Sequence, residues 1–156
     1  MSLEETISKL NTIKDTLEEF DENDLSELSG ISPSEIDKFA GWWASLNELR
    51  KLNLIQKINQ IAEENFELEF TEILYFTLRD TNPDIRIESL NGLWECEDYR
   101  IGDVASEILL EDSEESVKIE ACKLLRKFCY LIKDGKISGR ISEKIIHSLN
   151  LILSNT

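Results

Sequence analysis

The sequence predicts an all-α protein in which pairs of helices stack behind an amino-terminal helical cap. Its 156 residues include only two prolines and six glycines, and 41% of them are hydrophobic, which favours folded helices over loops. Apolar side chains recur at steps of three and four residues along most of the chain. A segment in the middle of the chain recurs 32 residues later, as expected when neighbouring units complete each other's core.

Residues 1–69 are predicted to form the cap, because they show helical spacing without the repeat. The first amphipathic helix is expected from six apolar residues: Leu3, Ile7, Leu10, Ile13, Leu17 and Phe20. The acidic stretch 21–24 lacks the spacing of a calcium loop and predicts a solvated loop. Ser32, Pro33 and Glu35 predict a helix start, because they supply a serine cap, a proline in the first turn and an acid three residues after the cap.

The rest of the cap is predicted to hold two more helices and a linking segment. The first of these helices is expected to bury Phe39 and Trp43 on one face and to leave Trp42 on another side. Residues 54–62 predict a further helix that ends near residues 64–65. Apolar side chains then alternate with acids at Phe66, Leu68 and Phe70. This short alternation has no partner strand, so we expect a linking segment whose aromatic side chains pack between helices.

The repeat aligns residues 78–89 with residues 110–121 and places Leu93 on Leu125. Each copy is preceded and followed by an apolar helical stretch, so the predicted unit is helix, turn, helix. Turn residues such as Asp, Asn, Pro and Ser cap the second helix or end the first. The predicted units are about 70–100, 101–136 and an incomplete 137–156, where residues 139–154 form a first helix only. We therefore expect the sequence to be a piece of a longer array.

The turns resemble those of HEAT repeats, in which an aspartate is followed six residues later by Arg or Lys after an aliphatic residue. Asp80 with Arg86, and Asp112 with Lys118, match this pattern. The resemblance implies that these four residues form a structural ladder in a right-handed α-solenoid whose second helices line the concave side. Residues 64–68 also resemble a segment that precedes the array in a group of bacterial HEAT-repeat proteins. HEAT arrays serve in very different systems, so the resemblance implies a fold and not a function.

Charge divides the chain into two parts of opposite sign. The net charge is −15, but residues 1–116 hold 9 basic and 29 acidic side chains, whereas residues 117–156 hold 8 basic and 3 acidic ones. Such polarity can steer a partner or associate copies head to tail. The net charge disfavours nucleic acid and anionic lipid. The acidic amino terminus, without an apolar run of about 18 residues, predicts a soluble cytoplasmic protein.

No group of residues predicts catalysis. The single histidine, His147, lies on the last predicted helix, and no glycine-rich phosphate loop is present in the sequence. Cys96, Cys122 and Cys129 are odd in number and lack CxxC spacing, which indicates neither a disulfide framework nor a zinc site. Cys122 and Cys129 are expected in the core. We therefore expect no enzyme activity, no cofactor and no metal.

The favoured function is a non-catalytic scaffold or adaptor that binds a protein partner of unknown identity. The predicted contact surface is the exposed face of the second helices: Glu88, Asn91, Glu95, Glu120, Lys123 and Lys127. Trp42 is a second candidate, because a tryptophan off the apolar face would be a rigid anchor for a partner. The competing interpretation of Trp42 is packing against the first helix.

Two other functions stay open. The chain could be an architectural segment that extends or dimerises a larger repeat protein. It could also be a nucleic-acid-binding HEAT-like protein related to DNA glycosylases, with Trp94 and Tyr130 near a basic stripe of Lys118, Lys123, Arg126 and Lys127. The charge of −20 on residues 1–116 argues against nucleic acid.

Overall fold

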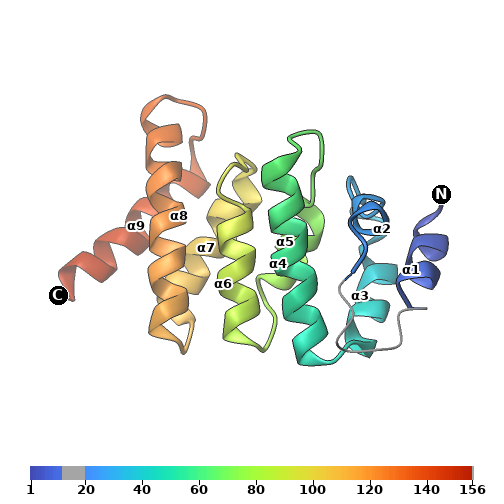
Figure 1. Ribbon diagram of the computed structural model, residues 1–156. Coiled ribbons are helices and arrows are strands. Elements are labelled where there is room, and N and C mark those ends of the chain that lie inside the picture. Colours follow the sequence, from blue (N-terminus) through green and yellow to red (C-terminus); the bar gives the residue numbers. More distant parts are fainter. Residues whose placement is uncertain (12–19, 156) are drawn as a thin grey trace. The chain divides into compact units, whose positions relative to one another are not determined.

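The protein is all-helical in the computed structural model, which describes residues 1–11 and 20–155 (Figure 1). The helices of these residues are α1 (Leu3–Asn11), α2 (Glu22–Ser26), α3 (Ile36–Ser45), α4 (Glu48–Glu64), α5 (Thr71–Thr77), α6 (Pro83–Gly92), α7 (Tyr99–Glu111), α8 (Glu115–Lys133) and α9 (Arg140–Ser154). No strand occurs in the described ranges, and the all-α prediction is confirmed. Ile13 and Leu17 of the predicted first helix lie outside these ranges.

The chain divides into two compact units, residues 1–89 and residues 90–156, which we describe in turn. The division falls inside α6, so that Ser89 belongs to the first unit and Leu90 to the second. The predicted boundary between cap and repeats, after residue 69, lies within the first unit and stays a prediction.

An aromatic cluster forms much of the core of the first unit. The ring centroid of Phe39 lies 5.8 Å from those of Trp42 and Trp43, and 6.0 Å from that of Phe76 on α5. Trp42 is only 5% exposed, and its Nε1 donates to Asn11 Oδ1 of α1 at 2.7 Å. The prediction of Trp42 as a partner anchor is therefore wrong. Because α3 contacts both α1 and α5, two sides of this helix are buried and not one.

A polar side chain caps the start of α2, and a polar turn precedes α3. Asp21 Oδ1 accepts from the backbone N–H groups of Asn23 (2.9 Å) and Asp24 (3.2 Å), which otherwise lack partners in a first helical turn. The acidic stretch 21–24 thus starts α2, and its prediction as a loop is wrong. Before α3, the N–H of Ser32 donates to Glu35 Oε2 at 3.0 Å, which is one half of the predicted capping box. Residues 33–35 nevertheless form a turn and α3 begins only at Ile36, so the predicted start at Ser32 and Pro33 is wrong by about one turn.

The predicted helix ending near residues 64–65 is confirmed, because α4 ends at Glu64. In the segment that follows, Phe70 is buried, but Phe66 is 94% exposed. The expectation that both aromatic side chains pack between helices is therefore wrong for Phe66. The reason is local: Asn65 Oδ1 accepts from the N–H of Glu67 at 3.0 Å and closes a tight turn, with Phe66 at its tip.

Hydrogen bonds join α6 to its neighbours in the first unit. The buried hydroxyls of Thr77 on α5 and Ser89 on α6 lie 2.6 Å apart. Asn59 of α4 donates from Nδ2 to the carbonyl oxygen of Glu88 at 2.9 Å. These bonds satisfy polar groups that burial would otherwise leave without partners.

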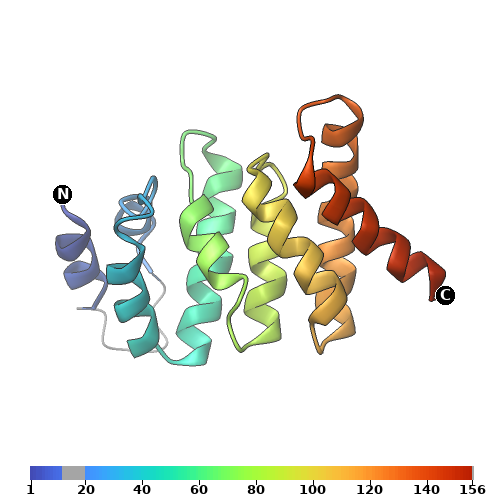
Figure 2. The same cartoon turned by 180° about the vertical axis from the view of Figure 1, so that it is seen from behind.

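Three helices, α7, α8 and α9, pack against one another in the second unit. Figure 2 shows α7 and α9 on one side of this unit, with α8 behind them. Gly102 permits their close approach, because a Cβ there would lie 2.9 Å from Cδ1 atoms of both Phe128 on α8 and Ile145 on α9. The predicted helix 139–154 is confirmed as α9.

Equivalent positions of the two predicted repeat copies have matching burial. The pairs, each 32 residues apart and each less than 2% exposed, are Ile85 with Val117, Ser89 with Ala121 and Leu93 with Leu125. The prediction that Cys122 and Cys129 lie in the core is wrong, since both are half-buried. Partial burial still raises the pKa of the Cys129 thiol above its usual value, and the charge of Cys122 acts in the same direction.

Candidate partner-binding surface

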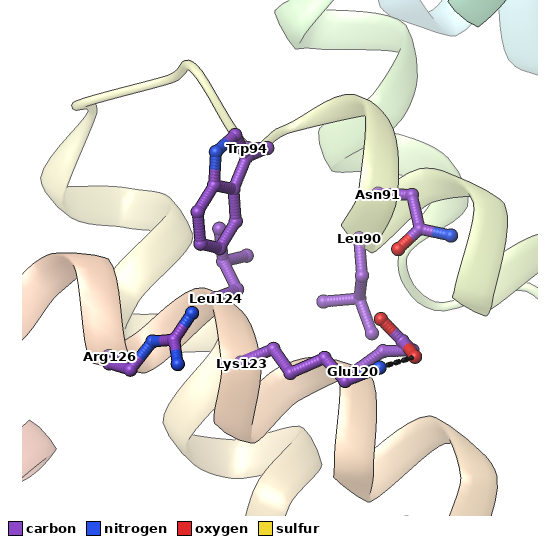
Figure 3. A pocket seen from close by; sticks show the side chains of 7 residues that line it. All are labelled: Leu90, Asn91, Trp94, Glu120, Lys123, Leu124 and Arg126. Carbon is purple, nitrogen blue, oxygen red and sulfur yellow. Dashed lines mark hydrogen bonds and ion pairs between the residues drawn. The ribbon is translucent and has the colours of Figure 1, made fainter.

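A groove of about 250 Å³ lies between the end of α6 and the middle of α8 (Figure 3). Its lining residues are Leu90, Asn91, Trp94, Glu120, Lys123, Leu124 and Arg126. Leu90 and Leu124 are buried, whereas Trp94 is 42% exposed and presents its indole ring to the groove. The groove thus combines apolar side chains with an exposed aromatic wall and a polar rim.

Lys127 holds the turn that carries Trp94. Its Nζ donates to the backbone carbonyl oxygens of Trp94 and of Cys96, the latter at 3.2 Å. Burial lowers the pKa of Lys127, while the charge of Glu95 acts to raise it. The predicted contact residue Lys127 therefore has a role within the fold, because it fixes the backbone behind the groove.

Four of the nine cations of the second unit contact carboxylates. Lys123 lies 2.7 Å from Glu120 at the groove rim, and Arg100 lies 2.7 Å from Asp98, whose pKa this hydrogen bond lowers. Elsewhere in the unit, Lys136 lies 3.9 Å from Glu97, and Lys144 bonds to both Asp103 and Glu107. These pairs leave fewer cations for a partner.

Arg126 is an exception at the groove. Among the residues that the structure describes, its guanidinium makes no hydrogen bond or ion pair, and the indole N–H of Trp94 likewise has no acceptor. Figure 3 shows both side chains in the groove, with Leu124 between them. An Arg fork and an indole N–H are therefore available beside apolar surface, a combination that suits a carboxylate next to an apolar group.

An exposed stripe continues from the groove along α8. Its members follow one another at steps of four, three, four and three residues: Ile119, Lys123, Arg126, Tyr130 and Lys133. All five are exposed, including Tyr130 at 64%. The stripe contains three cations and no acid, so it extends the positive rim of the groove over three turns or more of one helix face.

The structure brings three of the predicted contact residues together. Asn91, Glu120 and Lys123 line the groove. Glu95 is exposed in the turn after Trp94. Glu88 is half-buried and belongs to the first unit, so the structure does not place it with the others.

Sequence reasoning missed four lining residues of this surface as protein contacts: Leu90, Trp94, Leu124 and Arg126. It noted Trp94 and Arg126 only within the nucleic-acid alternative. Two signals in the sequence could have found this pair. Trp94 does not fit the apolar spacing of its predicted helix, and Arg126, 32 residues later, has no acidic residue three or four positions away.

The four predicted ladder residues lie in or next to the two turns. The carboxylate of Asp80 accepts from Trp43 Nε1 (2.8 Å) and from the N–H of Asn82 (2.9 Å). Arg86 Nη1 donates to the carbonyl oxygens of Asp80 (2.8 Å) and Thr81 (3.2 Å). In the second copy, Asp112 Oδ1 accepts from the N–H of Glu114 at 2.9 Å, and Lys118 is half-buried. These contacts stabilise each turn, and a ladder that joins the repeats stays a prediction.

A second hollow of about 220 Å³ lies in the first unit, lined by Phe20, Asn53, Gln56, Lys57 and Gln60. Its cation is already engaged, since Lys57 lies 2.8 Å from Glu22. This hollow therefore offers mainly amide groups and is a weaker candidate than the groove.

The described residues form neither a metal-binding cluster nor a membrane-spanning helix. Within the described ranges, no three His, Cys, Asp or Glu side chains converge as metal ligands, and His147 is exposed on α9. No helix of the same ranges has the length and apolarity needed to cross a bilayer.

The fold and the groove define an all-helical protein with an open, partly apolar and partly cationic surface. No known protein family, no curated protein and no solved structure matches the chain. Its function is therefore argued from its own residues.

Proposed function

We propose that the chain is a non-catalytic scaffold or adaptor that binds a segment of a partner protein in the groove beside Trp94. The observation that carries this proposal is the unengaged guanidinium of Arg126 next to an exposed indole and the buried Leu90 and Leu124. Tryptophan and arginine are the side chains most enriched where partners bind tightly.

We further propose a right-handed α-solenoid of HEAT-like helix pairs as the architecture that carries the groove. The matching burial of positions 32 residues apart supports this, because stacked units bury equivalent faces. So does the order of the helices, α5 with α6 and α7 with α8, each pair joined by a turn that an aspartate stabilises.

The chemistry of the groove favours one class of partner, a segment with an apolar side chain beside one or more carboxylates. The apolar side chain would cover Leu90, Leu124 and the Trp94 ring, with a gain of about 25 cal/mol per Å² of apolar surface removed from water. A carboxylate would accept two parallel N–H bonds from Arg126.

Nucleic acid is the second candidate, because the α8 stripe presents Lys123, Arg126 and Lys133 along one exposed face with Tyr130 among them. Against it, phosphate binding needs clustered cations, and Glu120 contacts Lys123 at 2.7 Å. The net charge of −15 also repels a polyanion.

Selection from a random peptide display library against the full chain tests the proposal. We expect enriched peptides to share an apolar residue next to acids, and to lose at least tenfold in affinity for Arg126→Glu. Arg140→Glu is the matched control, because Arg140 is exposed and does not line the groove. No enriched motif, or binding that Arg126→Glu does not change, would refute the proposal. Binding of a single-stranded oligonucleotide but no peptide would support the second candidate.

A further inference from the structure

A short turn joins α4 to α5 (Figure 1). It carries an apolar side chain that does not pack into the fold. Phe66 at its tip is 94% exposed, the largest exposure of any apolar side chain in the described residues. Covering this ring would remove a large apolar surface from water, so Phe66 is available as an anchor for a partner.

This turn is held rigidly on both sides of Phe66. Within it, Asn65 accepts from the N–H groups of Glu67 and Leu68, through Oδ1 at 3.0 Å and the carbonyl oxygen at 3.1 Å. Beyond it, Glu69 donates to Ser29 Oγ at 2.8 Å. The carbonyl oxygen of Glu69 accepts from the N–H of Gly30 at 2.8 Å, and Phe70 is buried. A pre-organised contact loses less conformational entropy on binding than a flexible one.

The surroundings of Phe66 are uniformly acidic. Residues 58–78 contain five acids and no Lys or Arg. Four of these acids lie within three residues of Phe66 and are exposed: Glu63, Glu64, Glu67 and Glu69. The turn therefore has the chemistry expected of an occupant of the groove, an apolar side chain flanked by carboxylates.

We propose that the Phe66 turn of one copy docks into the Trp94 groove of a second copy, with Arg126 facing the carboxylates beside Phe66. This inference rests on the proposed function of the groove and names its occupant. The volume is sufficient, because the groove offers about 250 Å³ and a cavity of about 150 Å³ holds a benzene ring. The charges are complementary, since all charged residues of 58–78 are acidic and all charged residues of the α8 stripe are basic.

The contact joins two different surfaces, so the association is heterologous. Each docked copy still has one free turn or one free groove, and assembly extends head to tail unless the rotation between copies closes a ring. A single aromatic anchor with a few ion pairs makes a small interface, so we expect weak, concentration-dependent association that salt reduces.

Sedimentation equilibrium of the full chain tests the inference, from about 10 μM to about 1 mM. We expect the average mass of the wild type to rise with concentration. Phe66→Ser, which lacks the anchor, and Arg126→Glu, which reverses the groove charge, should each weaken association at least tenfold. Leu49→Ser is the matched control and should associate as the wild type does, since Leu49 is another exposed apolar residue of the first unit.

A mixture of the two defective variants separates this interface from others. Phe66→Ser retains the groove and Arg126→Glu retains the turn, so their equimolar mixture should form a 1:1 dimer that does not extend. A strict monomer at all concentrations, normal association of Phe66→Ser, or no dimer in the mixture would overturn the inference. If one of these results is obtained but display-selected peptides still bind in an Arg126-dependent way, only self-docking is refuted and the proposed function is still supported.

Discussion

The bond between Trp43 and Asp80 is expected to be one of the strongest single contacts of the first unit. Asp80 lies in the turn between α5 and α6, and its Oδ2 accepts from Trp43 Nε1 of α3 at 2.8 Å. Asp80→Ala removes this bond and leaves the indole N–H of a residue that is only 4% exposed without its acceptor. It also removes the acceptor for the N–H of Asn82.

The cost of Asp80→Ala follows from these two bonds. A hydrogen bond between a buried donor and a charged acceptor contributes about 1.5–3 kcal/mol, and the more exposed bond within the turn contributes about 1 kcal/mol. We therefore expect Asp80→Ala to lower the free energy of unfolding by about 2–4 kcal/mol. Trp43→Phe removes the same indole hydrogen bond together with part of the ring. Both variants therefore lose the free energy of this one bond.

A double-mutant cycle isolates that shared term. Urea unfolding followed by far-ultraviolet circular dichroism would give the free energies of the wild type, both single variants and the double variant. We expect a coupling energy of about 1.5–3 kcal/mol. A coupling below about 0.5 kcal/mol would refute the assignment of this bond, because uncoupled residues lose stability additively.

Three further changes probe the second unit by the same unfolding measurement. Asp98→Ala removes the cap of α7 and should cost about 1 kcal/mol near neutral pH. Arg100 lowers the pKa of Asp98, so the stability of the wild type should fall as the pH drops below about 4. The stability of Asp98→Ala should fall less steeply with pH, and equal slopes of stability against pH would contradict this. Gly102→Val places side-chain atoms against Phe128 and should cost at least about 1–3 kcal/mol, whereas an unchanged midpoint would contradict the close approach. The carboxylate partners of Lys144 raise its pKa, so its contribution to stability should be present below about pH 10 and lost at higher pH. Lys144→Met should lower the free energy of unfolding by less than about 1 kcal/mol and remove this alkaline loss of stability. An unchanged alkaline profile in the variant would contradict the pairing.

Helical spacing and turn chemistry were sufficient to predict most helices. The end of α4 and the extent of α9 both follow from local signals such as a periodic apolar face. The same rules failed at residues 21–24, because an acidic run was interpreted as solvated when Asp21 in fact caps a short helix. Local bonding and not overall polarity decides such a segment.

The errors at Trp42 and Phe66 have a different cause. Periodicity assumes one buried face for each helix, but α3 contacts both α1 and α5, so both of its tryptophans are buried. Phe66 was expected to pack because it is aromatic, yet the turn closed by Asn65 directs it to solvent. Which side chain remains exposed depends on tertiary contacts that a single sequence does not display.

The groove was only half predictable for the same reason. Asn91, Glu120 and Lys123 were found because they lie on the outer faces of the predicted second helices. Trp94 and Arg126 come from different repeats, and their approach depends on the turn that Lys127 holds in place.

Fluorine NMR of the chain labelled with fluorotryptophan can show whether protein segments bind in the groove beside Trp94. Trp42 and Trp43 are nearly fully buried, whereas Trp94 is 42% exposed in the groove. On titration with a display-selected peptide we expect the Trp94 resonance alone to shift, and the shift to vanish in Arg126→Glu. If the Trp94 resonance does not move at saturating peptide, the peptide does not bind in the groove.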